Sequence, residues 1–177
     1  RVIALKPDLV VAWKSGNRNA HLDQLRALGV PVFINEPRRI DDVAKSLAQF
    51  GRLAGTGAAG EAAAKAFRAR HAALAARYSG RPKLRLFYEA WNRPLMTING
   101  EHLISDVIRL CGGDNVFAKR PMLAPTVDVE SVLATQPEVI VACGLGDGRR
   151  GWLDAWRLWR RLPAVAGGRT RSKFRFS

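Results

Sequence analysis

The sequence predicts an α/β protein made of two Rossmann-like lobes joined by a single long helix, with both lobes incomplete. Three observations predict this fold. Apolar strand segments alternate with amphipathic helical segments in both halves of the chain, which favours parallel sheets. An alanine-rich segment without proline separates the two halves, and a short unit near the start recurs in the second half.

In the first half, each predicted strand is followed by a helical segment. Segment 9–12 is a continuous apolar run, typical of a parallel strand buried on both faces, and 32–34 is the next strand. The leucines of 22–28 indicate a helix that stops before a glycine, and Asp41 and Asp42 open another. The order is therefore strand, helix, strand, helix.

The alanine-rich segment 58–78 predicts one helix of about 21 residues, roughly 31 Å long. It could be a surface helix packed on one sheet or a rigid spacer between two lobes. Because strands and helices alternate again after Pro82, the spacer is the better interpretation. We predict an N-terminal lobe at 1–56, an interlobe helix at 57–80, and a C-terminal lobe at 81–177 that ends in an aberrant basic tail at 170–177.

In the second half, two predicted strands alternate with three predicted helices. Asp128 is the expected N-cap of the second of these helices. The predicted strands are 84–88 and 138–142, and the predicted helices are 103–110, 128–134 and 152–161.

An internal repeat supports the two-lobed interpretation. Residues 1–12 (RVIALKPDLVVA) align without gaps with 131–142 (SVLATQPEVIVA), five of the twelve positions are identical, and Asp8 faces Glu138. Chance likeness is the alternative, because α/β proteins reuse such parts. The matched proline–acid pair favours duplication of a lobe.

The net charge of +14 does not indicate a nucleic-acid-binding protein. Nine basic residues follow position 148, so half of the excess lies in the last 31 residues, outside any recognition motif. No apolar run approaches the roughly 18 residues of a membrane span. The chain begins inside structure at Arg1, so we expect a fragment of a longer precursor whose signal peptide is not in this fragment.

Few residues suggest metal or catalytic chemistry. Cys111 and Cys143 lack the paired spacing of a zinc site and are interpreted as small buried residues, with a disulfide left open. Ser15 lacks a GxSxG setting, and the three histidines lie in helical stretches. We expect no metal, no cofactor and no catalysis, and keep an α/β hydrolytic enzyme as a remote alternative.

Two similar lobes create a cleft, and ligands of open α/β sheets bind at the carboxyl ends of the strands. The loops at those ends are 13–17, 35–37, 89–92 and 143–144.

Several segments resemble one family. Residues 5–13 (LKPDLVVAW) followed by Ser-Gly-Asn, 28–33 (LGVPVF), 99–104 (NGEHLI) and 110–117 (LCGGDNVF) resemble the cobalamin-binding proteins of ABC importers, within the helical-backbone class of periplasmic binding proteins. The resemblance extends to about Arg169. It implies a monomeric periplasmic protein that captures cobalamin (a corrinoid vitamin) between its lobes and delivers it to the permease dimer in the inner membrane.

The resemblance also implies site residues. Trp13 would lie in the corrin cleft, where a rigid aromatic gives large contact area, although partial core packing is the plainer interpretation of a tryptophan at a strand end. Trp91 occupies the corresponding loop of the second lobe. The expected ligand-binding residues are Trp13, Ser15, Gly16, Asn17, Glu36, Trp91 and Met96.

Glu130 matches a glutamate that, in this class, docks onto arginines of the membrane permease. The plainer interpretation is a solvated acid stabilised by the dipole at a helix N-terminus.

Carriers of ferric siderophores or haem share the fold and are the alternative function. A haem carrier would offer an axial ligand, for which Tyr88 is the candidate. A siderophore carrier would present arginines, for which Arg93 and Arg120 are candidates.

Overall fold

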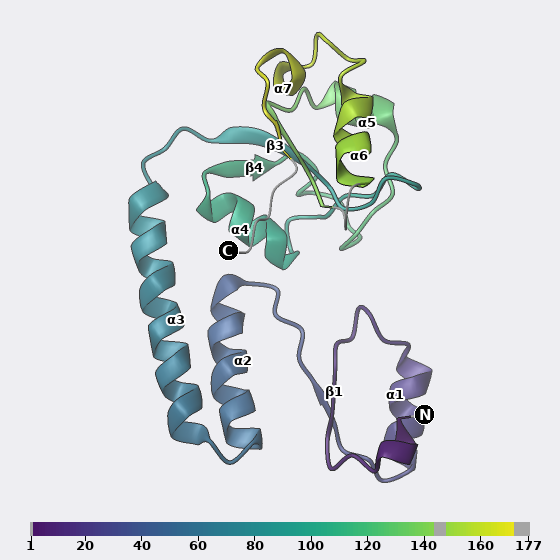
Figure 1. Ribbon diagram of the computed structural model, residues 1–177, viewed down its shortest axis with the longest axis vertical. Helices are drawn as coiled ribbons and strands as arrows, with labels where there is room; N and C mark the ends of the chain where they lie inside the picture. The colour runs from purple at the N-terminus through teal and green to yellow at the C-terminus, as the bar shows by residue number, and fades with distance from the viewer. Residues whose placement is uncertain (1, 144–147, 172–177) are drawn as a thin grey trace.

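The computed structural model describes residues 2–143 and 148–171 as two α/β lobes connected by a long helix (Figure 1). The first lobe contains a 3-10 turn and two strands, and a helical hairpin leads to the second lobe. In chain order the elements are η1 (Ile3–Leu5), β1 (Val10–Ala12), α1 (Asn19–Ala27), β2 (Val32–Ile34), α2 (Ile40–Leu53), α3 (Gly57–Tyr78), β3 (Leu84–Glu89), α4 (Leu103–Leu110), β4 (Gly113–Asn115), α5 (Val129–Ala134), β5 (Val139–Ala142), α6 (Gly148–Trp156), α7 (Pro163–Ala166) and β6 (Thr170–Arg171).

Both sheets are parallel, as the alternation of strands and helices predicts. β1 and β2 form a two-stranded sheet in which Val10 faces Val32. The second sheet has the order β4-β3-β5-β6. Parallel sheets place the carboxyl ends of neighbouring strands at one edge, so the loops that follow β1 and β2 lie together there.

Helix α3 does not stand alone, because α2 packs against it along much of its length (Figure 1). Buried Ala44, Ala48 and Ala64 fill the contact. Gly51 and Gly60 bring the two backbones close together, since a Cβ added to Gly60 would lie 2.8 Å from the Gly51 Cα. Small residues at such a crossing allow the helices to pack closely.

None of the described helices is both long and apolar enough to cross a membrane.

The main core lies in the second lobe, around the central strands of its sheet. Phe87 on β3 is fully buried and makes edge-to-face contacts with Phe117 and Trp156, at centroid distances of 5.8 and 5.5 Å. Val132 and Ile140 are also fully buried in this cluster. Aromatic pairs of this geometry add to the free energy gained from area burial.

The internal repeat is visible in the backbone. Lys6 and Gln136 occupy equivalent positions and have φ angles of 45° and 46°, and no other non-glycine residue in the described chain has a positive φ. Each donates its backbone N–H to the carbonyl three residues earlier, Lys6 to Ile3 and Gln136 to Leu133. The duplicated unit therefore shares its unusual turn as well as its sequence.

Some expectations from sequence were wrong. Val11 is 51% exposed, so β1 is not buried on both faces, and both cysteines are exposed and unpaired. Val11 lies on the opposite face of β1 from Val10 and Ala12, and only the face with Ala12 is packed. Cys111 and Cys143 lie just beyond the ends of α4 and β5, outside the packed faces of these elements.

The predicted helix at 152–161 is shifted. α6 ends at Trp156, and the following segment is a turn that leads into α7. Thr170–Arg171, the start of the predicted basic tail, form the edge strand β6 beside β5, because a two-residue strand is too short to show a period in the sequence. Positions 172–177 of the predicted basic tail, and Gly144, lie outside the described residues.

Candidate functional site

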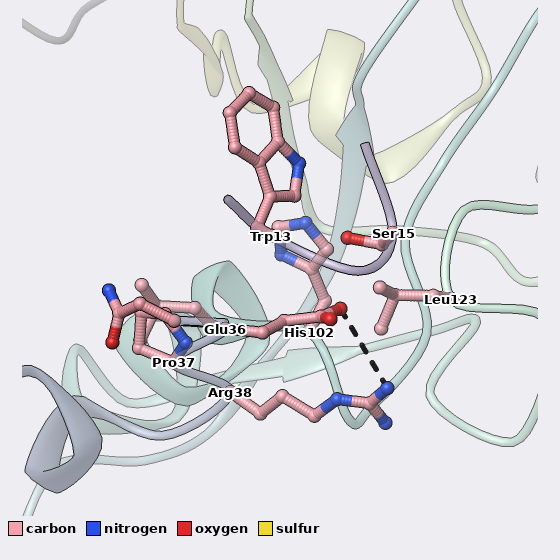
Figure 2. Close-up of a pocket in the computed structure, with 9 residues that line it drawn as sticks. Trp13, Ser15, Glu36, Pro37, Arg38, His102 and Leu123 are labelled. Carbon is pink, nitrogen blue, oxygen red and sulfur yellow. Dashed lines mark ion pairs between the residues drawn. The ribbon is translucent and has the colours of Figure 1, made fainter. Parts of the chain in front are cut away.

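A cavity of about 340 Å³ lies between the two lobes (Figure 2). The first lobe supplies the loops after β1 and β2, and the second supplies the start of α4 and the segment before α5. The volume of the cavity is within the range of small-molecule binding sites. The lining residues are Trp13, Ser15, Asn35, Glu36, Pro37, Arg38, His102, Leu103 and Leu123.

Trp13 is held in place by the loop that follows it. Its backbone N–H donates to the Asn17 side-chain oxygen at 3.0 Å, and its carbonyl accepts from the Asn17 N–H at 3.1 Å. The indole packs over Gly16, where a Cβ would overlap the ring. The side chain nevertheless remains 54% exposed. Gly16 and Asn17 thus support Trp13, while Ser15 itself lines the cavity.

Glu36 brings an unsatisfied carboxylate oxygen to the cavity. Its side chain is 17% exposed, and the nearest cation, Arg38, is 3.8 Å from Oε1. Among the described residues, Glu36 Oε1 is the buried side-chain oxygen or nitrogen that has no hydrogen-bond partner. A buried acceptor without a donor costs free energy, so a ligand N–H at this point would be favourable. Figure 2 shows the Trp13 indole pointing away from the Glu36–Arg38 pair, so the indole does not contact these two charged groups.

The second lobe contributes three residues that sequence reasoning did not assign to the site, His102, Leu103 and Leu123. His102 caps α4, because its Nδ1 accepts the Ile104 N–H at 3.1 Å. Burial lowers the pKa of His102, so the ring is neutral at pH 7 and its hydrogen is on Nε2. The ring is therefore a hydrogen-bond donor at the cavity. Its position in the NGEHLI segment was the available signal.

Polar contacts beside the cavity hold the two lobes together. Arg38 pairs with Glu101 at 3.1 Å and Arg39 with Asp106 at 3.1 Å. Asp106 on α4 also accepts the Ile40 N–H at 2.8 Å, so it caps the N-terminus of α2 from the other lobe.

Burial raises the pKa of Asp106, but hydrogen bonds from Ile40, Arg109 and Arg39 outweigh it and lower the pKa overall. The carboxylate is therefore charged at neutral pH. Since these contacts cross from α4 to the start of α2, they fix the width of the cavity.

Trp91 and Met96 lie in a separate part of the second lobe and do not line this cavity. They form a short antiparallel bridge, and the Trp91 ring makes an edge-to-face contact with Trp152 at 5.6 Å. Trp91 is 53% exposed. Beneath it, buried Glu89 accepts the Trp156 indole N–H at 2.9 Å, which anchors α6 to the end of β3.

Glu130 is exposed in the first turn of α5, after the expected N-cap Asp128, whose side chain accepts the Ser131 N–H at 2.6 Å. It borders a second cavity of about 360 Å³ together with Leu158 and Trp159. Glu130 is not among the residues that line the cavity between the lobes.

The residues considered for haem or siderophore do not meet at the interlobe cavity. Tyr88 is 2% exposed, and burial together with a hydrogen bond to Cys143 raises its pKa, so it is a core residue. Arg93 and Arg120 are absent from the lining. The described residues contain no cluster of three metal-ligating side chains.

Comparison with known proteins defines the class to which this fold and cavity belong. A family model for periplasmic binding proteins matches residues 1–171, and the chain belongs to this family. It is 36% identical over 168 residues to the vitamin B12-binding protein of Vibrio parahaemolyticus, covering 93% of this chain and 59% of the relative. It is 40% identical over 144 residues to that of Yersinia pestis, covering 81% of this chain and 51% of the relative. The chain thus spans between half and three fifths of these curated relatives.

Solved structures agree with this assignment. The periplasmic vitamin B12-binding protein of Vibrio cholerae superimposes with a TM-score of 0.88 at 31% identity, covering 98% of this chain and 67% of that chain. A periplasmic haem-binding protein from Roseiflexus has a TM-score of 0.78 at 23% identity, covering 97% and 68%, and shows the fold alone.

Proposed function

We propose that the protein is the substrate-binding component of an ABC importer and that it captures cobalamin in the cleft between its lobes. The proposal rests mainly on the interlobe cavity, which is lined by both the exposed Trp13 indole and Glu36, whose Oε1 has no hydrogen-bond partner among the described residues. The names of the relatives support a corrinoid as the ligand.

The chemistry of the cavity suits a corrinoid, which is a broad ring with apolar faces and an edge of amide side chains. Trp13 offers a rigid aromatic surface to the ring. Glu36 Oε1 accepts a hydrogen bond from an amide NH₂, and His102 Nε2 donates one to an amide carbonyl. A site with one free acceptor and one free donor is complementary to an amide, which carries both groups.

The size of the cavity determines how the ligand sits. A corrinoid is larger than the 340 Å³ of this cavity, so part of the ligand would extend beyond the cavity over the neighbouring surface of the lobes. Trp91 and Met96, at the carboxyl end of β3, would contact the part of the ligand that extends over the second lobe. Gly16 and Asn17 would contribute by fixing Trp13.

The remaining roles follow from the same proposal. The protein works in the periplasm as a monomer without a cofactor or catalysis, and cobalamin is its cargo. Exposed Glu130 docks onto arginines of the permease dimer in the inner membrane, since its carboxylate is accessible and makes no ion pair with the described residues.

Calorimetric titration of the chain with cobalamin, haem and a ferric siderophore tests the ligand. We expect binding of cobalamin, and Trp13→Ala should weaken it about 30-fold, as expected for a buried aromatic anchor. Trp159→Ala is the matched control, because Trp159 lies at the other cavity, and it should leave the affinity unchanged. Tight binding of haem or siderophore without cobalamin binding would replace the corrinoid with the alternative ligand.

A second variant tests the polar contact. Glu36→Gln keeps the shape of the side chain but replaces one acceptor oxygen with a donor NH₂. We expect about a tenfold loss of cobalamin affinity, since a hydrogen bond to a charged group contributes about 1.5 kcal/mol or more. Unchanged affinity in the same calorimeter would remove Glu36 from the site.

A further inference from the structure

The turn that follows α6, Arg157–Arg161, presents apolar and basic side chains together. Leu158 is 83% exposed, more than any other large apolar side chain in the described chain, and neighbouring Trp159 is 43% exposed. Arg157, Arg160 and Arg161 are exposed beside them. We call these five residues the Arg157–Arg161 turn.

The exposure of Leu158 is built into the fold. The residues that flank the turn are buried, Trp156 at 4% and Leu162 at 2%. Within the turn, Trp159 donates its N–H to the Trp156 carbonyl at 3.0 Å, and Leu162 donates to the Trp159 carbonyl at 2.9 Å. Since Trp156 is also hydrogen-bonded to buried Glu89, the turn projects from a fixed base.

The charges of the turn are largely uncompensated. Arg157 pairs with Asp154 at 3.2 Å, whereas the ion pairs of the described residues include neither Arg160 nor Arg161. Glu130 is the acid that borders the same cavity as Leu158. A partner that covers this turn therefore needs negative charge beside an apolar layer.

We propose that the Arg157–Arg161 turn binds the anionic surface of a lipid bilayer. A bilayer offers phosphate groups above a hydrocarbon layer, which matches a leucine and a tryptophan directly followed by two arginines that make no ion pair with the described residues. Tryptophan favours the boundary between headgroups and acyl chains, and each basic side chain near an anionic surface adds to the attraction. The contact area is small, so the binding is peripheral and reversible.

The contact of the turn with lipid does not depend on which ligand binds in the interlobe cavity. Glu130 and the turn border the same cavity, so the face of the second lobe that carries Glu130 would be the one that reaches the membrane. Arginines of a permease would pair with Glu130 but would be repelled by Arg160 and Arg161, so the turn itself fits anionic lipid better.

Co-sedimentation of the chain with lipid vesicles tests the inference. We expect binding to vesicles of equal parts phosphatidylglycerol and phosphatidylcholine, and little binding to pure phosphatidylcholine. Arg160→Gln with Arg161→Gln should weaken binding about 25-fold, from about fivefold for each charge. Leu158→Asp should weaken it at least tenfold, because a carboxylate would meet the anionic surface.

Two control variants show whether vesicle binding depends on the Arg157–Arg161 turn or on the overall positive charge of the protein. Arg70→Gln with Arg77→Gln removes the same charge from α3, and Leu5→Asp alters an equally exposed leucine of the first lobe. Both should leave vesicle binding nearly unchanged, and circular dichroism verifies that each variant is folded.

Three results would overturn the inference: no sedimentation with anionic vesicles, equal losses in the control variants, or binding that requires permease protein in the vesicle. Trp13→Ala should retain vesicle binding, so failure of the cobalamin proposal and failure of this one are distinguishable.

Discussion

The two copies of the repeated unit have the same backbone turn but very different surroundings. In the first copy, Val2 is 46% exposed, and in the second the equivalent Val132 is fully buried. Ile140 is also fully buried, whereas the equivalent Val10 is partly exposed.

The difference in burial between the two copies comes from the elements that pack around each of them. β5 is paired on both sides, by β3 and β6, and its unit joins the large aromatic core. Within the described part of the chain, β1 pairs with β2 alone. A sequence unit therefore determines its own turn and strand, but the elements packed around it determine how much free energy its burial contributes.

The largest effect is expected from truncating the equivalent valine in each of the two copies. Val132→Ala should lower the free energy of unfolding by about 2.5 kcal/mol, because it removes buried methyl groups and leaves a cavity. Val2→Ala should change it by less than about 0.5 kcal/mol. Urea denaturation measures both, and equal losses would contradict the difference in burial.

A smaller effect is expected at the contact between the lobes. Asp106→Asn removes the charge that the Arg39 guanidinium and the Ile40 N–H contact, and should cost about 1.5 kcal/mol. Amide hydrogen exchange should become faster in α2 than in β5, because α2 loses its partner in the other lobe. Asp114→Asn, at an exposed position on β4, is the control and should have little effect.

The same carboxylate predicts a pH dependence. The pKa of folded Asp106 is lowered, so its contribution to stability is complete above the unfolded pKa of about 3.9. It is lost as the pH falls through the folded pKa. The stability difference between the wild type and Asp106→Asn, measured by urea denaturation, should therefore shrink below about pH 4; a constant difference would exclude Asp106 as the charged partner.

The smallest expected effect tests the shared turn. Lys6→Gly and Gln136→Gly each relieve a left-handed conformation but add freedom to the unfolded chain, so the net change should stay within about 0.5 kcal/mol and have the same sign. Gln24→Gly, inside α1, should instead destabilise by about 1 kcal/mol. Opposite signs at the two turn positions, in thermal denaturation, would show that the turns differ in solution.

Local pattern predicted much of the fold. The apolar runs at β1 and β5 and the alanine-rich α3 were visible because each element carries its own periodicity or propensity. β4 and β6 were not, since segments of three and two residues have no usable period. The exposure of Cys111 and Cys143 was also missed, because burial depends on packing that a linear pattern does not contain.

The interlobe cavity was predictable in part. Trp13, Ser15 and Glu36 follow strands, and the position of ligand sites in α/β sheets identified their loops. His102, at the start of α4, reaches the cavity because α4 docks on the start of α2 through Asp106. Such a contact between residues more than sixty positions apart leaves no local signal.

The glycine contact between α2 and α3 gives the molecule a mechanical property. Gly60 lies near the start of α3, and Tyr78 at its far end is about 27 Å away along the axis. A side chain added at Gly51 or Gly60 would push α2 and α3 apart close to the turn that joins them. A displacement of one methyl group there would tilt α3 against α2, so a substitution remote from the cavity would strain the Asp106 contact that holds the lobes together.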